Sequence, residues 1–323
     1  MTASLAGKTV LVTGGLGFLG SALVRALARA GATVRVLDSL LPQGGGSPRH
    51  LDGVGGNVTV TIEDTRSRDI VNHLVTGCDV VYHCAGHDGI SALAMDWYSE
   101  MDVSCIGTLH VLDAARVYAP QAHVVFTSAS AVYGAGQGAP LTEDAPTEPV
   151  SIFGVHKLAG EKYCGVYRAG YGLHSTVARL GTIFGPGQRL RGASTESVAH
   201  LIDAALHDEA LRLRDQGRTP VDALHVDDAV TALLALGVRG HDGNDVVNVG
   251  HGCTLTSATL AEAIVRAAGH GHVERSDIAA PLGTGLVMNV DRLRALGVPA
   301  PSQSLDAALA ATLAWYRGHT RAP

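Results

Sequence analysis

The chain of 323 residues has little of what marks several classes of protein. Its net charge of −6 comes without a basic cluster, so nucleic acid and anionic membranes are poor candidate partners. No apolar run approaches the roughly 20 residues that span a bilayer, and the N-terminus shows no cleavable signal. The five cysteines are scattered and form no CxxC pair, which indicates neither a disulfide framework nor a zinc site. We therefore expect a soluble, cytoplasmic protein without a metal.

Lysine is also scarce. The chain has three lysines, Lys8, Lys157 and Lys162, against 21 arginines. A composition that favours arginine so strongly makes each remaining lysine informative. At 46% hydrophobic and 17% charged residues, the chain can bury a substantial core. Its length allows one large α/β domain, or a main domain with a smaller lobe.

A glycine-rich turn follows the first apolar run. Residues 9–13 are short, β-branched and apolar, as in a strand that is buried on both faces. Gly14, Gly17 and Gly20 then give G-x-x-G-x-x-G, and a helical pattern follows that ends at Gly31. Glycine lets a diphosphate approach the backbone N–H groups and the dipole of a helix N-terminus. The pattern predicts a dinucleotide-binding turn.

An aspartate ends the next predicted strand. Asp38 follows "VRVL", 18 residues after Gly20. A carboxylate at this place can accept hydrogen bonds from the ribose hydroxyls of adenosine and would repel a 2′-phosphate. The alternative is an N-cap aspartate in a loop. We predict that NAD is preferred over NADP.

Strands and helices then alternate. We predict strands at residues 58–62, 80–83 and 124–127, helices around residues 67–75 and 93–118, and a surface loop at residues 40–57. This alternation is typical of an α/β fold with a doubly wound parallel sheet, and we expect a smaller C-terminal substrate-binding lobe. We assign residues 1–180 to the NAD-binding domain and residues 181–323 mainly to the lobe. A strand and helix near residues 221–250 are expected to return to the first domain.

Several ordered motifs resemble one family along nearly the whole chain. "TGGLGFLG", "EDTR", "VVYHCAG", "TSASAVYG", "FGVHKLAGE", "RLGTIFGPGQR", "HVDDAVTALLAL" and "NVGHG" follow one another in family order. The chain resembles the extended short-chain dehydrogenase/reductases, especially the NAD-dependent sugar-nucleotide epimerases and dehydratases. The resemblance implies a homodimer that uses NAD. The implied cofactor contacts are Gly14, Gly17, Phe18, Leu19, Gly20, Asp38, Asp64, Thr65, Cys84, Ala85, Gly86 and Lys157.

The catalytic positions depart from the family pattern. In that family a Tyr-x-x-x-Lys pair and a Ser or Thr assist hydride transfer, because the substrate hydroxyl must lose its proton as the hydride leaves. The chain keeps Lys157, but Phe153 stands at the tyrosine position and Ala129 at the Ser/Thr position. The usual proton relay is therefore missing. The second family role of Lys157, a hydrogen bond to the nicotinamide ribose, is undisturbed.

Other groups are candidates for proton transfer. His87 follows a predicted strand at the carboxyl edge of the sheet, where ligands bind in such folds, and histidine titrates near neutrality. Ser128 and Ser130 flank Ala129, and either hydroxyl is a candidate for a substrate hydrogen bond. Tyr133 is a further candidate, although a packing role is the simpler interpretation.

The substrate side departs as well. Val221 stands where the family often has an arginine that holds a nucleotide diphosphate, and Thr182 replaces a frequent asparagine. Arg189 and Arg218 are candidate anion contacts, with an ordinary surface arginine as the alternative. We expect these three polar residues, Thr182, Arg189 and Arg218, to contact substrate.

The sequence thus predicts an NAD-dependent epimerase/dehydratase-like enzyme with a non-standard acid/base set. Its substrate would be a sugar, a nucleotide sugar or a sugar-like metabolite, acted on through transient hydride transfer. One alternative is a non-catalytic NAD(H)-binding sensor or scaffold. Another is an isomerase or cyclase that keeps NAD as a structural element.

Overall fold

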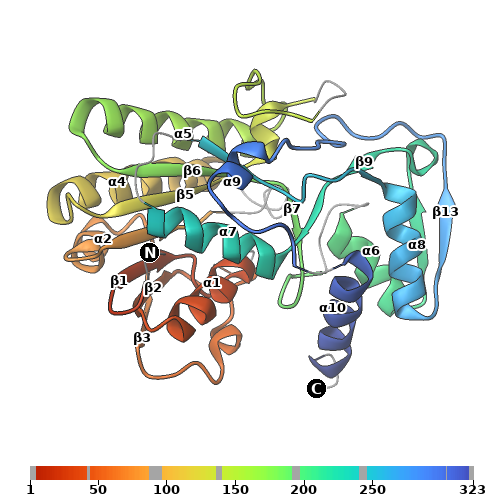
Figure 1. Cartoon of the computed structure of the whole chain (residues 1–323), viewed down its shortest axis with the longest axis horizontal. Coiled ribbons are helices and arrows are strands. Elements are labelled where there is room, and N and C mark those ends of the chain that lie inside the picture. The colour runs from red at the N-terminus through yellow and green to blue at the C-terminus, as the bar shows by residue number, and fades with distance from the viewer. Residues whose placement is uncertain are drawn as a thin grey trace.

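A seven-stranded parallel sheet forms the centre of the molecule (Figure 1). The computed structural model describes residues 5–41, 44–86, 97–135, 140–190, 197–239, 246–302 and 304–319. The strand order is β11-β6-β5-β4-β1-β2-β3. The chain adds β2 and β3 on one side of β1, and then crosses back to add β4 and the later strands on the other side. This confirms the doubly wound parallel sheet. The strands are β1 (Thr9–Thr13), β2 (Thr33–Asp38), β3 (Val58–Ile62), β4 (Val80–His83), β5 (His123–Ala129), β6 (Ser175–Leu180) and β11 (Val246–Val249).

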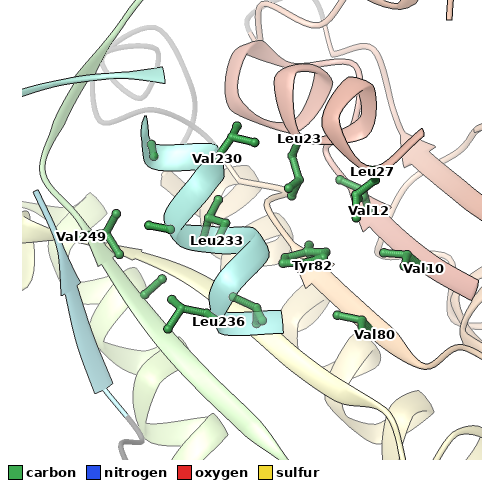
Figure 2. Close-up of a cluster of buried hydrophobic side chains, with 14 of the residues drawn as sticks. Val10, Val12, Leu23, Leu27, Val80, Tyr82, Val230, Leu233, Leu236 and Val249 are labelled. Carbon is green, nitrogen blue, oxygen red and sulfur yellow. The ribbon is translucent and has the colours of Figure 1, made fainter. Parts of the chain in front are cut away.

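Helices cover both faces of the sheet (Figure 1). Apolar side chains from α1 and α7 pack with Val12 and Tyr82 on one face, where Leu23 and Leu233 are fully buried (Figure 2). A second cluster on the opposite face includes Phe126. Burial on both faces explains why the central strands are almost continuously apolar. The helices of the two faces together are α1 (Phe18–Arg29), α2 (Arg68–Val75), α3 (Trp97–Met101), α4 (Gly107–Tyr118), α5 (Ile152–Tyr171) and α7 (Val226–Arg239).

The sequence patterns predicted most of these elements, but not a π-helical turn and a 3₁₀ turn. The helix expected around residues 93–118 is broken in its described part by a π-helical turn at Asp102–Ile106, between α3 and α4. The loop expected after Asp38 contains a 3₁₀ turn at Pro48–Leu51, and the Nδ1 of His50 lies 2.8 Å from the carbonyl oxygen of Leu16. This contact fixes the loop beside the glycine-rich turn, which local sequence patterns do not reveal.

The remaining elements form a lobe beside the sheet. A third apolar cluster joins α6, α8 and α10, and Leu201, Ile264 and Leu309 are fully buried in it. The division of the chain after residue 180 stays a prediction, but β11 pairs with β6 and α7 packs against α1. The lobe and its connections contain β7 (Thr182–Phe184), α6 (Val198–Leu206), β8 (Ala210–Leu213), β9 (Pro220–Val221), β10 (Ala223–His225), β12 (Leu255–Thr256), α8 (Ser257–Ala268), β13 (His272–Arg275), α9 (Asp291–Ala295) and α10 (Leu305–His319).

The described part of the chain contains neither a helix that could span a membrane nor a cluster that could bind a metal. Among the helices in that part of the chain, none has the length and apolar character to cross a membrane. The described His, Cys, Asp and Glu side chains contain no cluster of three that could hold a metal ion.

The packing of α5 on β5 gives a stability prediction. A Cβ on Gly160 would lie 2.4 Å from Cζ of the buried Phe126, so Gly160→Ala forces the helix away from the sheet. We expect a loss of about 1–3 kcal/mol in the free energy of unfolding, measured by urea denaturation. Gly165→Ala on the same helix is the control, because its Cβ would meet no atom closer than 3.8 Å. It should stabilise the protein by roughly 0.5–1 kcal/mol, and equal effects of the two changes would contradict this packing.

Candidate active site

One cleft of about 570 Å³ runs along the carboxyl ends of the central strands. Gly14, Cys84 and Ser130 line it, and they follow directly after β1, β4 and β5. Residues of the lobe, among them Thr182 and Ser257, line the same cleft. Ligands of open α/β sheets bind at this edge, where the strand order reverses. The fold therefore brings the glycine-rich turn, Lys157 and the lobe to one cavity.

The glycine-rich turn leaves no room for side chains. Gly14 has a φ of +68°, and a Cβ on it would lie 2.8 Å from the backbone nitrogen of Ala85. A Cβ on Gly20 would lie 2.0 Å from the carbonyl oxygen of Gly14. Gly17 is the N-cap of α1, which begins at Phe18 beside the cleft. The N-terminal dipole and N–H groups of α1 therefore suit the diphosphate of a dinucleotide.

Asp38 ends β2 and lines the cleft, so it is not a helix N-cap. Its two carboxylate oxygens accept hydrogen bonds from the backbone nitrogens of Leu16 and Leu40, each at 2.9 Å. These bonds fix the carboxylate and leave lone pairs that can accept ribose hydroxyls. Gly46 lies so close that a Cβ on it would be 3.2 Å from Asp38 Oδ1. The loop after β2 thus encloses this carboxylate.

The other predicted cofactor residues also border the cleft. Asp64 follows β3 and forms an ion pair of 2.9 Å with Arg66, which orients its carboxylate. Burial raises the pKa of the Cys84 thiol to about 12, so this thiol is neutral at physiological pH. The predicted cofactor residues that line the cleft are Gly14, Gly17, Phe18, Leu19, Gly20, Asp38, Asp64, Thr65, Cys84, Ala85, Gly86 and Lys157.

Lys157 is the buried cation of the site. Its Nζ donates to the carbonyl oxygen of Thr127 at 2.8 Å, and it lies 5.8 Å from the ring centre of Phe153. The spacing of four places Phe153 and Lys157 on one face of α5, and both line the cleft. Burial lowers the pKa of the Lys157 amino group to about 8. The amine therefore exchanges a proton within the physiological range, unlike an exposed lysine.

The two serines beside Ala129 have different surroundings. Ser128 borders the cleft but is buried, and its hydroxyl donates to Glu161 Oε1 at 2.6 Å. Ser130 is half-buried after the end of β5 and lines the cleft, as Ala129 does. Of these two hydroxyls, that of Ser130 is better placed for a ligand.

Tyr133 belongs to a buried polar network. Its hydroxyl donates to Asn248 Oδ1 at 2.6 Å and accepts from Arg179 Nη1 at 2.9 Å. Burial raises the pKa of Tyr133, so its phenol stays protonated. Arg179 also contacts Glu161 through two nitrogens, at 2.9 and 2.7 Å. These contacts favour the packing interpretation of Tyr133 over proton transfer.

The pair between Glu161 and Arg179 was not expected from the sequence. Both residues are buried, and Glu161 lies one helical turn after Lys157 on α5. A bidentate pair of this kind fixes geometry as well as charge. It ties α5 to β6, and Ser128, which donates to Glu161, borders the cleft. The arginine that opens "RLGTIFGPGQR" was the available signal, but its partner depends on tertiary packing.

The profile of the NAD dependent epimerase/dehydratase family matches residues 10–250. This chain is a member of that family. A dTDP-glucose 4,6-dehydratase from Streptomyces griseus is 31% identical over 321 residues, which cover 96% of this chain and 94% of that relative. The epimerase/dehydratase resemblance expected from the motifs is therefore confirmed. The protein is an NAD-dependent enzyme of this family, and the binding-only alternative is not favoured.

Two solved structures extend the comparison. The first is UDP-N-acetylglucosamine 4-epimerase from Methanobrevibacter ruminantium in complex with UDP-N-acetylmuramic acid. It has a TM-score of 0.87 at 25% identity and covers 97% of this chain and 99% of its own. The second is UDP-glucose 4-epimerase from Thermus thermophilus in complex with NAD, with a TM-score of 0.82 at 28% identity. That alignment covers 96% of this chain and 99% of the other.

Only some of the remaining predicted site residues line the cleft. Thr182 and Arg189 line the cleft. Arg218 is exposed, pairs with Asp215 at 2.5 Å and is not among the residues that line the cleft. His87 lies outside the described residues. His156, which precedes Lys157 on α5, lies largely buried with Nδ1 3.4 Å from Oε1 of the buried Glu100.

The enclosure of Asp38 gives a prediction about cofactor choice. We expect NAD⁺ to bind at least about tenfold more tightly than NADP⁺, because the fixed carboxylate repels a 2′-phosphate. Asp38→Ser should weaken NAD⁺ binding about tenfold through the loss of charged hydrogen bonds. It should also reduce the preference for NAD⁺ over NADP⁺. Isothermal titration calorimetry measures both affinities. Asp52→Ser, an exposed change in the same loop, serves as control and should alter neither. Equal affinity of the unmodified protein for both dinucleotides contradicts the role of Asp38.

Proposed function

We propose that the protein acts on a sugar or nucleotide sugar by transient hydride transfer, with Lys157 and Ser130 in place of the usual acid/base residues. The supporting observation is the position of the Lys157 amino group. It is buried beside Phe153 in the cleft that holds the dinucleotide turn, and burial lowers its pKa to about 8. An amine with this pKa can accept the proton of a substrate hydroxyl near neutral pH.

The residues of the cleft have separate roles in this reaction. Gly14, Gly17 and Gly20 admit the diphosphate of NAD, Asp38 binds a ribose, and the bound cofactor supplies the hydride acceptor. Ser130 donates a hydrogen bond that orients the reacting hydroxyl. Lys157 accepts its proton and returns it when the carbonyl is reduced again. Phe153 cannot move a proton, and its ring keeps water from the amine.

Substitution of the lysine tests this proposal directly. NAD-loaded protein mixed with dTDP-glucose or UDP-glucose should give a transient absorbance near 340 nm. Its formation should slow by about 10²–10⁴-fold in Lys157→Met. The rate should rise with pH and level off above about 8, because only the neutral amine accepts a proton. Lys162→Met, an exposed change on the same helix, is the control and should keep the rate. A Lys157→Met variant with an unaltered rate contradicts the assignment.

Restoring the family residues is a second test. Phe153 and Ala129 both line the cleft, so Phe153→Tyr combined with Ala129→Ser should rebuild the missing relay. We expect hydride transfer from dTDP-glucose or UDP-glucose to accelerate by about 10²-fold or more. Stopped-flow absorbance measures the change, and Phe153→Leu with Ala129→Ser is the matched control without a phenol. No gain over that control means that residue 153 does not face the reacting hydroxyl.

A further inference from the structure

Two buried hydroxyls line the part of the cleft that the lobe forms. Ser257 is 4% exposed, and Thr219 is half-buried as a residue, although its Oγ1 is inaccessible to solvent. Within the described part of the chain, neither Ser257 Oγ nor Thr219 Oγ1 has a hydrogen-bond partner, and both residues border the cleft. A buried hydroxyl without a partner costs about 1–3 kcal/mol. Such a cost at two residues that line the same cleft points to a ligand that supplies the missing hydrogen bonds.

The backbone explains why these two residues are neighbours. Strands β9 and β12 pair antiparallel, with Thr256 opposite Pro220. Ser257 then begins α8, and its N donates to Thr219 O at 2.8 Å. This backbone hydrogen bond holds Thr219 and Ser257 beside each other at the cleft.

The surroundings favour an uncharged ligand group. In the first turn of α8, Ser257 N donates to Thr219 O, and Thr259 N donates to Thr256 Oγ1, so these amides are already used within the protein. The cleft lining contributed by the lobe includes the uncharged residues Val198, Ala199, Pro220, Val221 and Leu286. The cleft-lining Arg189 lies against the loop that encloses Asp38, since a Cβ on Gly45 would be 3.5 Å from Arg189 Cβ.

We propose that Thr219 and Ser257 form a hydrogen-bonding subsite for an uncharged, hydroxyl- or carbonyl-bearing part of the substrate. The inference rests on the proposed function, because the same cleft holds the reacting group. Gly285 packs against the same segment, since a Cβ on it would lie 3.2 Å from Cδ of Pro220 and 3.6 Å from Cγ2 of Thr219. A sugar ring and a nucleoside both offer uncharged hydroxyls or carbonyls.

Ligand-observed NMR titration of the NAD-loaded protein tests the subsite with three probes. Methyl α-D-glucopyranoside stands for a free sugar, uridine for a nucleoside, and inorganic pyrophosphate for an anion. We expect at least one uncharged probe to bind, and the one that binds identifies the source of the hydroxyls. Thr219→Val combined with Ser257→Ala should weaken that binding about tenfold, the effect of losing two neutral hydrogen bonds. Thr254→Val, an exposed change in the segment before β12, is the control and should leave binding unchanged.

Three results overturn the subsite. Neither uncharged probe binds, the double variant binds the uncharged probe as tightly as the unmodified protein, or the double variant loses affinity for pyrophosphate instead. NAD⁺ affinity is measured in parallel and should stay the same in every variant, which separates a failed subsite from a failed cofactor site. Where the double variant does not fold, each single change should weaken binding about two- to threefold.

Discussion

The hydrogen bond from Lys157 Nζ to the Thr127 carbonyl is the contact on which the site depends. It joins α5 to the end of β5 and holds the amine at the edge where Gly14 and Ala129 also border the cleft. Burial there has two consequences. The amine keeps a fixed position, and its charged form is destabilised. A site without the family tyrosine thereby retains a group that can take a proton near neutral pH.

The surrounding structure keeps this contact in register. The bidentate pair of Glu161 and Arg179 binds α5 to β6 one turn beyond Lys157, and Ser128 adds a bond from β5. A buried pair of this kind contributes little net stability, since desolvation offsets the attraction. Its value here lies in orientation, and loss of one partner would leave the other charge buried and unpaired. The close contact of Gly160 with Phe126 acts in the same direction.

Local patterns predicted the parts of the site that depend on short stretches of chain. β1 begins and ends where its apolar run does, and Gly14, Gly20 and Asp38, the predicted cofactor contacts, all line the cleft. Long-range contacts escaped prediction. The sequence alone does not distinguish Ser128 from Ser130 as a substrate contact. The difference arises because the Ser128 hydroxyl donates to Glu161, which lies 33 residues away in the chain. Packing was the simpler interpretation of Tyr133 in the sequence, but its partners Asn248 and Arg179 could not be predicted. Such partners are set by packing between elements.

The central claim is that Lys157 carries a buried, readily deprotonated amine, and a direct titration of that amine tests it. With only three lysines in the chain, NMR of protein labelled at lysine ¹³Cε can resolve each one, and single substitutions assign the signals. We predict that the Lys157 signal titrates near pH 8. Titration at the ordinary lysine value of about 10.4 would show an amine exposed to water and would contradict the account.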